Sequence, residues 1–188
     1  LPYDVVFILN EFFAAAGRAI ESHGGWIDKF LGDGLLAVFG QHVGLETGAR
    51  QVLRAARAID IALDQVNARL SGEIGQSLRI GIGVHAGNLL VGRIGYGDSI
   101  ALTVIGNVVN VASRLESLTK QYGMQIIISS EVAKLAGSLG EDASEFTVEV
   151  RGVSAPMQVV GLKRARNIPA TVLIPTEDET AAKVRRFG

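Results

Sequence analysis

The chain has 188 residues, enough for one domain with its own hydrophobic core, and with 48% hydrophobic and 20% charged residues it is globular rather than disordered. A net charge of -1 gives no electrostatic case for binding nucleic acid or an anionic membrane, and the absence of cysteine excludes disulfides, thiolate metal sites and a cysteine nucleophile. No apolar run is long enough to span a bilayer and no signal peptide is visible, so we expect a cytoplasmic domain, which could belong to a larger or membrane-attached protein.

Two amphipathic helices are predicted in the first seventy residues. From Pro2 to Ser22, apolar residues recur at three- and four-residue steps, with a proline in the first turn and a Gly-Gly pair after the end. From Glu46 to Leu70, a second apolar stripe has Arg and Asp residues on the other faces of the predicted helix.

Between these helices, the segment from Trp26 to Phe39 is typical of a β-hairpin. Two apolar runs flank Gly32-Asp33-Gly34, and Gly and Asp are residues that tight turns favour. Asp33 should therefore lie at the hairpin tip. Side-chain alternation would place Lys29 on the same side as Asp33 if the strand extends that far. For the hairpin alone, a turn Asp with a surface Lys explains these residues about equally well.

The second half of the chain alternates short predicted strands and helices. A polar connection over residues 71–77 precedes them. Apolar runs between turn signals predict strands at 78–85, 89–94, 100–105 and 125–129 and a closing hairpin of 146–150 with 158–162. Helices are predicted from about Val108 to Tyr122, with Asn107 as the N-cap, and from Glu131 to Ala136.

The order helix, hairpin, helix, strand predicts an α+β fold built on a ferredoxin-like, palm-like split βαβ unit. We expect this domain at residues 1–162 and an exposed tail with a basic end at 163–188. A complete unit starts with a strand before its first helix, whereas this sequence begins at the helix. We expect that the residues of that strand exist but are absent from this chain, since a domain without it would expose apolar surface and unpaired backbone groups.

Three motifs carry a family resemblance. They are K-F-L-G-D-G at 29–34, G-V-H-A-G at 83–87 and T-V-I-G-N-V-V-N-V-A-S-R-L-E at 103–116. Each is weak alone, but in this order and at these separations they resemble the catalytic domain of class III nucleotidyl cyclases, over roughly residues 2–162. The resemblance implies an enzyme that makes cyclic AMP or cyclic GMP from a nucleoside triphosphate. In that family the first strand carries an F-x-D-like motif with the first metal-binding Asp, and nothing here matches it.

The resemblance assigns roles to the charged residues. Asp33 matches the second metal-binding Asp of the family, which implies two Mg²⁺ or Mn²⁺ ions per active site. Asn110 and Arg114 are four residues apart, so they share one helix face. Without the resemblance they would be an ordinary solvated helix surface. With it, Asn110 orients the ribose and Arg114 stabilises charge on the α-phosphate in the transition state.

The resemblance also predicts how the base is recognised. Lys29 and Thr103 match the base-reading pair, in a combination that resembles a bacterial-type subclass. Guanylyl-type members carry Glu at the position of Lys29, and the Thr103 hydroxyl can accept a hydrogen bond from the adenine amino group, so ATP is the expected substrate. Arg151 matches a basic position that contacts the triphosphate, although an Arg at a strand edge is more often simply solvated.

In this family each active site lies between two protomers. The metal carboxylates come from one protomer, and the base-reading pair, the Asn and the Arg come from the other. A chain that contains both sets is expected to form a two-fold homodimer with two equivalent sites.

The expected function is therefore an adenylate cyclase that converts ATP to 3′,5′-cyclic AMP and pyrophosphate by in-line attack of the ribose 3′-OH. Two alternatives stay open: a non-catalytic nucleotide-binding or dimerisation module, and a guanylate cyclase. An upstream sensor or regulatory domain is possible. A diguanylate cyclase would need a G-G-[DE]-E-F-like turn, which residues 32–35 do not supply. Residues 87–92 have P-loop glycine spacing but lack the Lys-Ser/Thr that should follow.

Overall fold

The structure, a computed structural model, describes residues 2–71 and 77–174. Its helices are α1 (Pro2–Ser22), α2 (Leu45–Leu70), α3 (Asn107–Tyr122), α4 (Ser130–Ala136) and α5 (Ala170–Leu173). Its strands are β1 (Trp26–Leu31), β2 (Gly34–Val38), β3 (Ile82–Val84), β4 (Leu90–Ile94), β5 (Ala101–Ile105), β6 (Ile126–Ser129), β7 (Ser144–Val148) and β8 (Met157–Leu162). Short 3-10 helices lie at η1 (Gly97–Ser99) and η2 (Ala165–Asn167). None of the helices in these ranges is both long enough and apolar enough to cross a membrane.

Most of the elements confirm the sequence-based expectations, and two differ. The strand predicted at 78–85 is only three residues long, because β3 spans Ile82–Val84. Asn107 is not an N-cap: α3 begins at Asn107 itself, and Gly106, which has no side chain, occupies the cap position. Most of the polar connection predicted at 71–77 lies outside the described residues.

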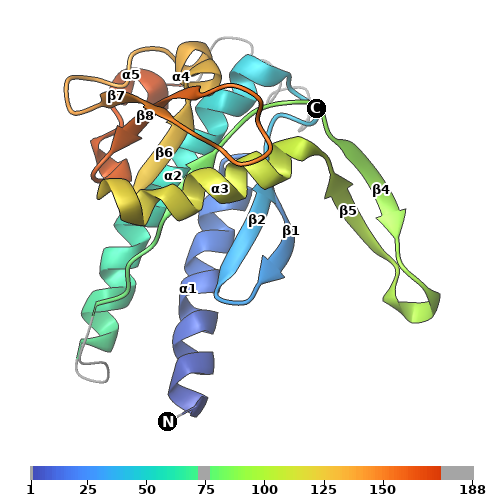
Figure 1. Ribbon diagram of the computed structural model, residues 1–188. Coiled ribbons are helices and arrows are strands. Elements are labelled where there is room, and N and C mark those ends of the chain that lie inside the picture. The colour runs from blue at the N-terminus through green and yellow to red at the C-terminus, as the bar shows by residue number, and fades with distance from the viewer. Residues whose placement is uncertain (1, 72–76, 175–188) are drawn as a thin grey trace, which may run out of the picture.

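The strands form three separate sheets (Figure 1). The largest has the order β3-β6-β8-β7, with β3 parallel to β6 and the other neighbours antiparallel. The antiparallel pairs β1-β2 and β4-β5 form the other two. Within the described residues β3 pairs only with β6, and the strand expected before α1 is not among them. The combination of helices with these small sheets confirms the α+β prediction.

A glycine fixes how α3 packs on the largest sheet. A Cβ atom built on Gly83 of β3 would lie 2.2 Å from the backbone oxygen of Ala112 and 2.3 Å from the backbone nitrogen of Glu116. No side chain fits there, so Gly83 lets the α3 backbone approach the strand directly. The glycine that opens the G-V-H-A-G motif therefore has a packing role: it seats the helix that carries Asn110 and Arg114.

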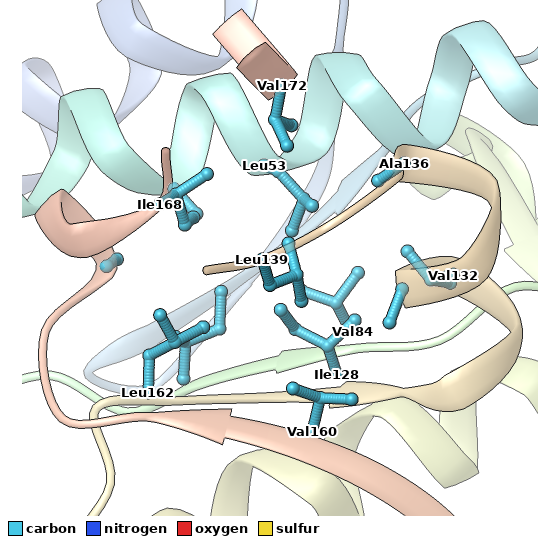
Figure 2. Packing of buried hydrophobic residues seen from close by; sticks show 14 of the residues in the cluster. Leu53, Val84, Ile128, Val132, Ala136, Leu139, Val160, Leu162, Ile168 and Val172 are labelled. Atoms are coloured by element: carbon cyan, nitrogen blue, oxygen red, sulfur yellow. The ribbon is translucent and has the colours of Figure 1, made fainter. Parts of the chain in front are cut away.

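The main hydrophobic core lies between α2, the largest sheet and α4 (Figure 2). Leu53 of α2 points toward Val84 of β3 and Ile128 of β6, and all three are buried. Burying one such side chain fully stabilises a fold by about 1.5–3 kcal/mol. A second core cluster lies under α3, where Val111 and Leu115 are buried against Ile127 of β6.

The exposed tail expected at 163–188 is wrong for residues 163–174. Ala165, Ile168 and Val172 are buried and belong to the main core, and Figure 2 shows Ile168 and Val172 beside α2. The basic end of the predicted tail lies outside the described residues. The segment after β8 therefore completes the domain instead of leaving it, at least as far as residue 174.

A buried carboxylate explains why this charged segment packs inward. Asp60 of α2 has a fully buried side chain, and it accepts hydrogen bonds from Arg164 Nη2 at 2.7 Å, Arg166 Nε at 2.8 Å and Gln125 Nε2 at 2.9 Å. Burial works to raise the pKa of Asp60, but the hydrogen bonds from Arg166, Arg164 and Gln125 outweigh it and hold the pKa well below its usual value. The two arginines that look like a solvated tail in the sequence are thus partners of an internal charge.

Candidate functional site

An irregularity in the first hairpin sets the direction of two neighbouring side chains. Ile27 pairs with Ala37 and Lys29 pairs with Leu36, so Asp28 is an extra residue in β1, a β-bulge. A bulge interrupts side-chain alternation and re-aims side chains. Here it allows Asp28 and Lys29, which are adjacent in the chain, to reach the same partner on another strand.

That partner is Thr103 of β5. Lys29 Nζ donates a hydrogen bond to Thr103 Oγ1 at 2.5 Å, across 74 residues of sequence. Asp28 Oδ2 lies 3.0 Å from Lys29 Nζ and accepts from Thr103 Oγ1 at 3.2 Å, while Asp28 Oδ1 accepts from the Val104 backbone N–H at 3.1 Å. The structure thus brings together the two residues that the sequence paired for base recognition.

Burial differs sharply within this Asp28-Lys29-Thr103 cluster. The Asp28 side chain is 0% exposed, whereas the Lys29 side chain is 40% exposed. Lys29 can therefore meet a ligand while Asp28 holds it from behind. Asp28 could not be found from the sequence pattern, because strict alternation would send its side chain away from that of Lys29.

Asp33 stands apart from this cluster. It lies exposed in the turn between β1 and β2, beyond the end of the strand, with Gly32 at φ +64° beside it. The cation near it in sequence, Lys29, pairs with Asp28 instead. This arrangement removes the simple explanation of Lys29 and Asp33 as a surface ion pair.

The described residues do not form a cation site by themselves. Across residues 2–71 and 77–174, no group of three or more His, Asp or Glu side chains is placed to hold a metal ion. Mg²⁺ and Mn²⁺ prefer several oxygen ligands, and Asp33 offers one carboxylate. The donor set of a single protomer, as far as it is described, therefore does not fit a two-metal centre.

Asn110 and Arg114 lie one turn apart on α3, as predicted. Asn110 is exposed and Arg114 is half-buried. Arg114 makes no hydrogen bond or ion pair with the described part of the chain. A Cβ atom on Gly152 (φ +82°) would lie 2.9 Å from Arg114 Nη1, so the guanidinium rests against the turn that follows the exposed Arg151. The Arg114 guanidinium is thus positioned by packing, while its N–H donors remain free for a ligand.

His85, from the G-V-H-A-G motif, directly follows β3. Its Nδ1 atom is buried and has no hydrogen-bond partner among the described residues. Burial lowers the pKa of His85, and the negative charge of Glu131 opposes this only in part. The ring is therefore held neutral at pH 7, and nothing in its surroundings gives it a catalytic partner within the described chain.

The β4-β5 hairpin projects as an arm away from the rest of the molecule (Figure 1). Its surface is unusually apolar, with Leu90 76% and Tyr96 92% exposed. The other large apolar side chains exposed on it are Ile94, Ile100, Leu102 and Ile105. Many exposed apolar side chains gathered on one projecting element are typical of a protein interaction site. Thr103 lies on β5, so this arm carries one member of the predicted base-reading pair.

Comparison with known proteins identifies the family. The family model described as "Adenylate and Guanylate cyclase catalytic domain" matches residues 1–166. An adenylate cyclase of Anabaena cylindrica is 39% identical over 137 residues, which cover 71% of this chain and 26% of that protein. Among solved structures, the guanylyl cyclase Cya2 has a TM-score of 0.77 at 34% identity, covering 86% of this chain and 81% of Cya2. The adenylyl cyclase CyaB from P. aeruginosa has a TM-score of 0.72 at 26% identity, covering 85% of this chain and 82% of CyaB.

These relatives confirm the cyclase fold that the three ordered motifs predicted. The curated relatives are much longer than this chain, which spans 26% of the Anabaena protein and 25% of Adenylate cyclase 1 from Rhizobium meliloti. The family model, by contrast, covers the described chain from α1 to η2. The chain therefore belongs to the adenylate and guanylate cyclase catalytic domain family.

Proposed function

We propose that this domain is the catalytic domain of an adenylate cyclase, which converts ATP to 3′,5′-cyclic AMP and pyrophosphate. The observation that carries the proposal is the Lys29-Thr103 pair, joined at 2.5 Å from two separate sheets. Adenine presents the N1 acceptor beside its 6-amino donor. An ammonium donor beside a hydroxyl acceptor is the complementary pattern.

The remaining predicted residues act on the ribose and phosphates. In the proposed reaction the bond from the ribose 3′-oxygen to the α-phosphorus forms, the bond from the α-phosphorus to the bridging oxygen breaks, and pyrophosphate leaves. The 3′-OH proton passes to solvent. Negative charge gathers on the α-phosphoryl oxygens, where the free guanidinium fork of Arg114 can stabilise it. We assign Asn110 to orienting the ribose and Arg151 to the triphosphate.

We assign Asp33 as one ligand of a divalent cation, Mg²⁺ or Mn²⁺. Its exposed carboxylate has no ion-pair partner in the described chain and is free to bind a cation. Because the described residues add no third carboxylate or histidine to it, a bound cation would need ligands from outside them. The number of ions, two in the sequence-based prediction, stays a prediction.

We further propose that the active form is a homodimer with shared sites. Within one protomer no hydrogen bond or ion pair among the described residues links the Asp28-Lys29-Thr103 cluster to Asp33 or Arg114. The apolar β4-β5 arm exposes six large side chains, which a second copy of the chain would cover. An interface that includes this arm would place the Thr103 strand at the junction of the two protomers.

A guanylate cyclase is the second candidate, because the solved structure at 34% identity and TM-score 0.77 is a guanylyl cyclase. A third is a regulatory module that binds nucleotide without turnover, which the incomplete cation site would suit. A sensor or regulatory domain elsewhere in the protein also stays a prediction.

The deciding experiment measures cyclic AMP and cyclic GMP made from ATP or GTP with Mn²⁺, over a range of protein concentration. The purified protein should retain any sequence that flanks this chain. Cyclic AMP formed from ATP, with specific activity rising as dimers assemble, is the expected result. Cyclic GMP from GTP alone would favour the second candidate. No product from either nucleotide, with a folded and dimeric protein, would favour the regulatory module.

A further inference from the structure

We propose that Asp28 is a positioning residue that fixes the hydrogen-bond polarity of Thr103 and thereby selects adenine over guanine. This inference rests on the proposed function, since it concerns the base preference of the same site. It assigns to Asp28 a role separate from that of Lys29, its neighbour in the chain.

The Thr103 hydroxyl has one proton and two lone pairs. Its contact with Asp28 Oδ2, at 3.2 Å, joins it to a carboxylate, which only accepts. The hydroxyl must therefore donate its single proton to Asp28. Its contact with Lys29 Nζ joins it to an ammonium group, which only donates, so the hydroxyl oxygen accepts there.

These two contacts leave Thr103 with one free lone pair and no free proton. Toward a ligand it is an acceptor only. The 6-amino group of adenine donates and would be satisfied at this position, whereas the 6-oxygen of guanine accepts and would face another acceptor. An unsatisfied polar group in a site built for hydrogen bonding costs much more binding than a lost apolar contact.

Asp28 is itself held too firmly to turn away. Its side chain is fully buried, and Oδ1 accepts from the Val104 N–H at 3.1 Å, one residue after Thr103. The bulge between Ile27 and Lys29 gives the side chain its direction toward β5. The carboxylate therefore bridges the hairpin and the arm, and it orients the Thr103 hydroxyl before any nucleotide arrives.

The sharpest test is Asp28→Asn. The amide oxygen can replace Oδ1 and keep the bond from Val104, while the amide nitrogen replaces Oδ2 with a donor. The Thr103 hydroxyl would then accept from the amide, and its proton would be free to meet the guanine oxygen. We expect the ratio of kcat/KM for ATP to kcat/KM for GTP to fall by about tenfold or more, mainly through KM. Glu141→Gln, which removes one exposed acid, is the matched control and should leave the ratio unchanged.

A double-mutant cycle separates this role from simple structural support. In a Thr103→Val background there is no hydroxyl to orient, so adding Asp28→Asn should change the base preference by less than about twofold. An equal effect of Asp28→Asn in both backgrounds would overturn the inference. If Asp28→Asn does not fold, the inference is tested with Thr103→Val and Thr103→Ser instead. The inference requires the valine variant to lose the preference for ATP and the serine variant to keep it.

Binding of non-hydrolysable ATP and GTP analogues, measured on the same proteins, separates the two proposals. Cyclic AMP production with a base preference that Asp28→Asn leaves intact would overturn the inference and leave the function standing. If no cyclic nucleotide forms, but the protein prefers the ATP analogue and Asp28→Asn removes that preference, the inference is supported and the proposed function is overturned. A wild-type protein that binds neither analogue would overturn both.

Discussion

The buried carboxylate of Asp60 offers the most direct test of how the end of the domain is held. Asp60→Asn replaces an acceptor-only group with an amide that presents a donor toward Arg164 or Arg166. Removing one partner of a buried ion pair costs about 3–5 kcal/mol. The two arginine side chains are 43% and 33% exposed, so water can partly replace the lost carboxylate. We therefore expect a loss of about 3 kcal/mol in the free energy of unfolding at pH 7, near the lower end of that range.

The assay is equilibrium unfolding in urea, with the melting temperature as a second measurement. A loss of about 3 kcal/mol corresponds to a fall in Tm of about 6–12 °C for a domain of this size. Asp64→Asn is the matched control: this side chain also binds both arginines, at 3.1 and 2.6 Å, but is 50% exposed. We expect that control to cost less than about 1 kcal/mol. Equal losses for the two variants would refute the reasoning that burial makes the Asp60 interaction strong.

The ion pairs of Asp60 also predict how the stability of the domain depends on pH. Because the folded-state pKa of Asp60 lies below its unfolded value, its contribution is fully present above the unfolded pKa, about 4, and is lost as pH falls through the lower folded value. The stability difference between wild type and Asp60→Asn should therefore shrink below about pH 4. A difference that stays constant from pH 7 into this range would show that the ionised carboxylate is not what stabilises the fold.

Three further predictions concern the site. Asp33→Ala should abolish Mn²⁺-dependent turnover without changing the Tm, because it removes an exposed carboxylate; full activity would refute its assignment to the cation. Arg114→Ala should lower kcat by about 100-fold or more, as loss of a transition-state charge clamp does, and a change confined to KM would contradict that role. Lys29→Glu should weaken the preference for ATP over GTP in competition assays, since it reverses the charge beside Thr103; an unchanged preference would remove Lys29 from base recognition.

Local patterns in the sequence were enough to predict most of the elements. The apolar periodicity from Pro2 to Ser22 matches α1 in both bounds, and the Gly-Asp-Gly turn predicts the β1-β2 hairpin. These features depend on residues close together in the chain, and so does the shared face of Asn110 and Arg114 on α3. The Lys29-Thr103 pairing was available only through the ordered family motifs, because 74 residues separate the two.

The features that the sequence did not reveal depend on distant partners. Arg164 and Arg166 look like part of a solvated tail until Asp60, about a hundred residues earlier, is placed beside them. Asp28 was missed because a bulge is a shift in register between two strands, and the β1 sequence alone shows only alternation. In both cases a fully buried acidic side chain forms ion pairs with basic residues that the sequence pattern would place on the surface without a partner.

The two groups of predicted site residues are held to different degrees within one protomer. The predicted base-reading pair is fixed by a buried carboxylate, a backbone N–H and a cross-sheet hydrogen bond, so the base recognition that we propose would be pre-organised in the single chain. Asp33 and Arg114 have no such partners among the described residues, and their charges are left for a ligand or a second protomer to neutralise. The base preference should therefore be a property of each chain, whereas phosphate chemistry should depend on how two chains assemble around the nucleotide.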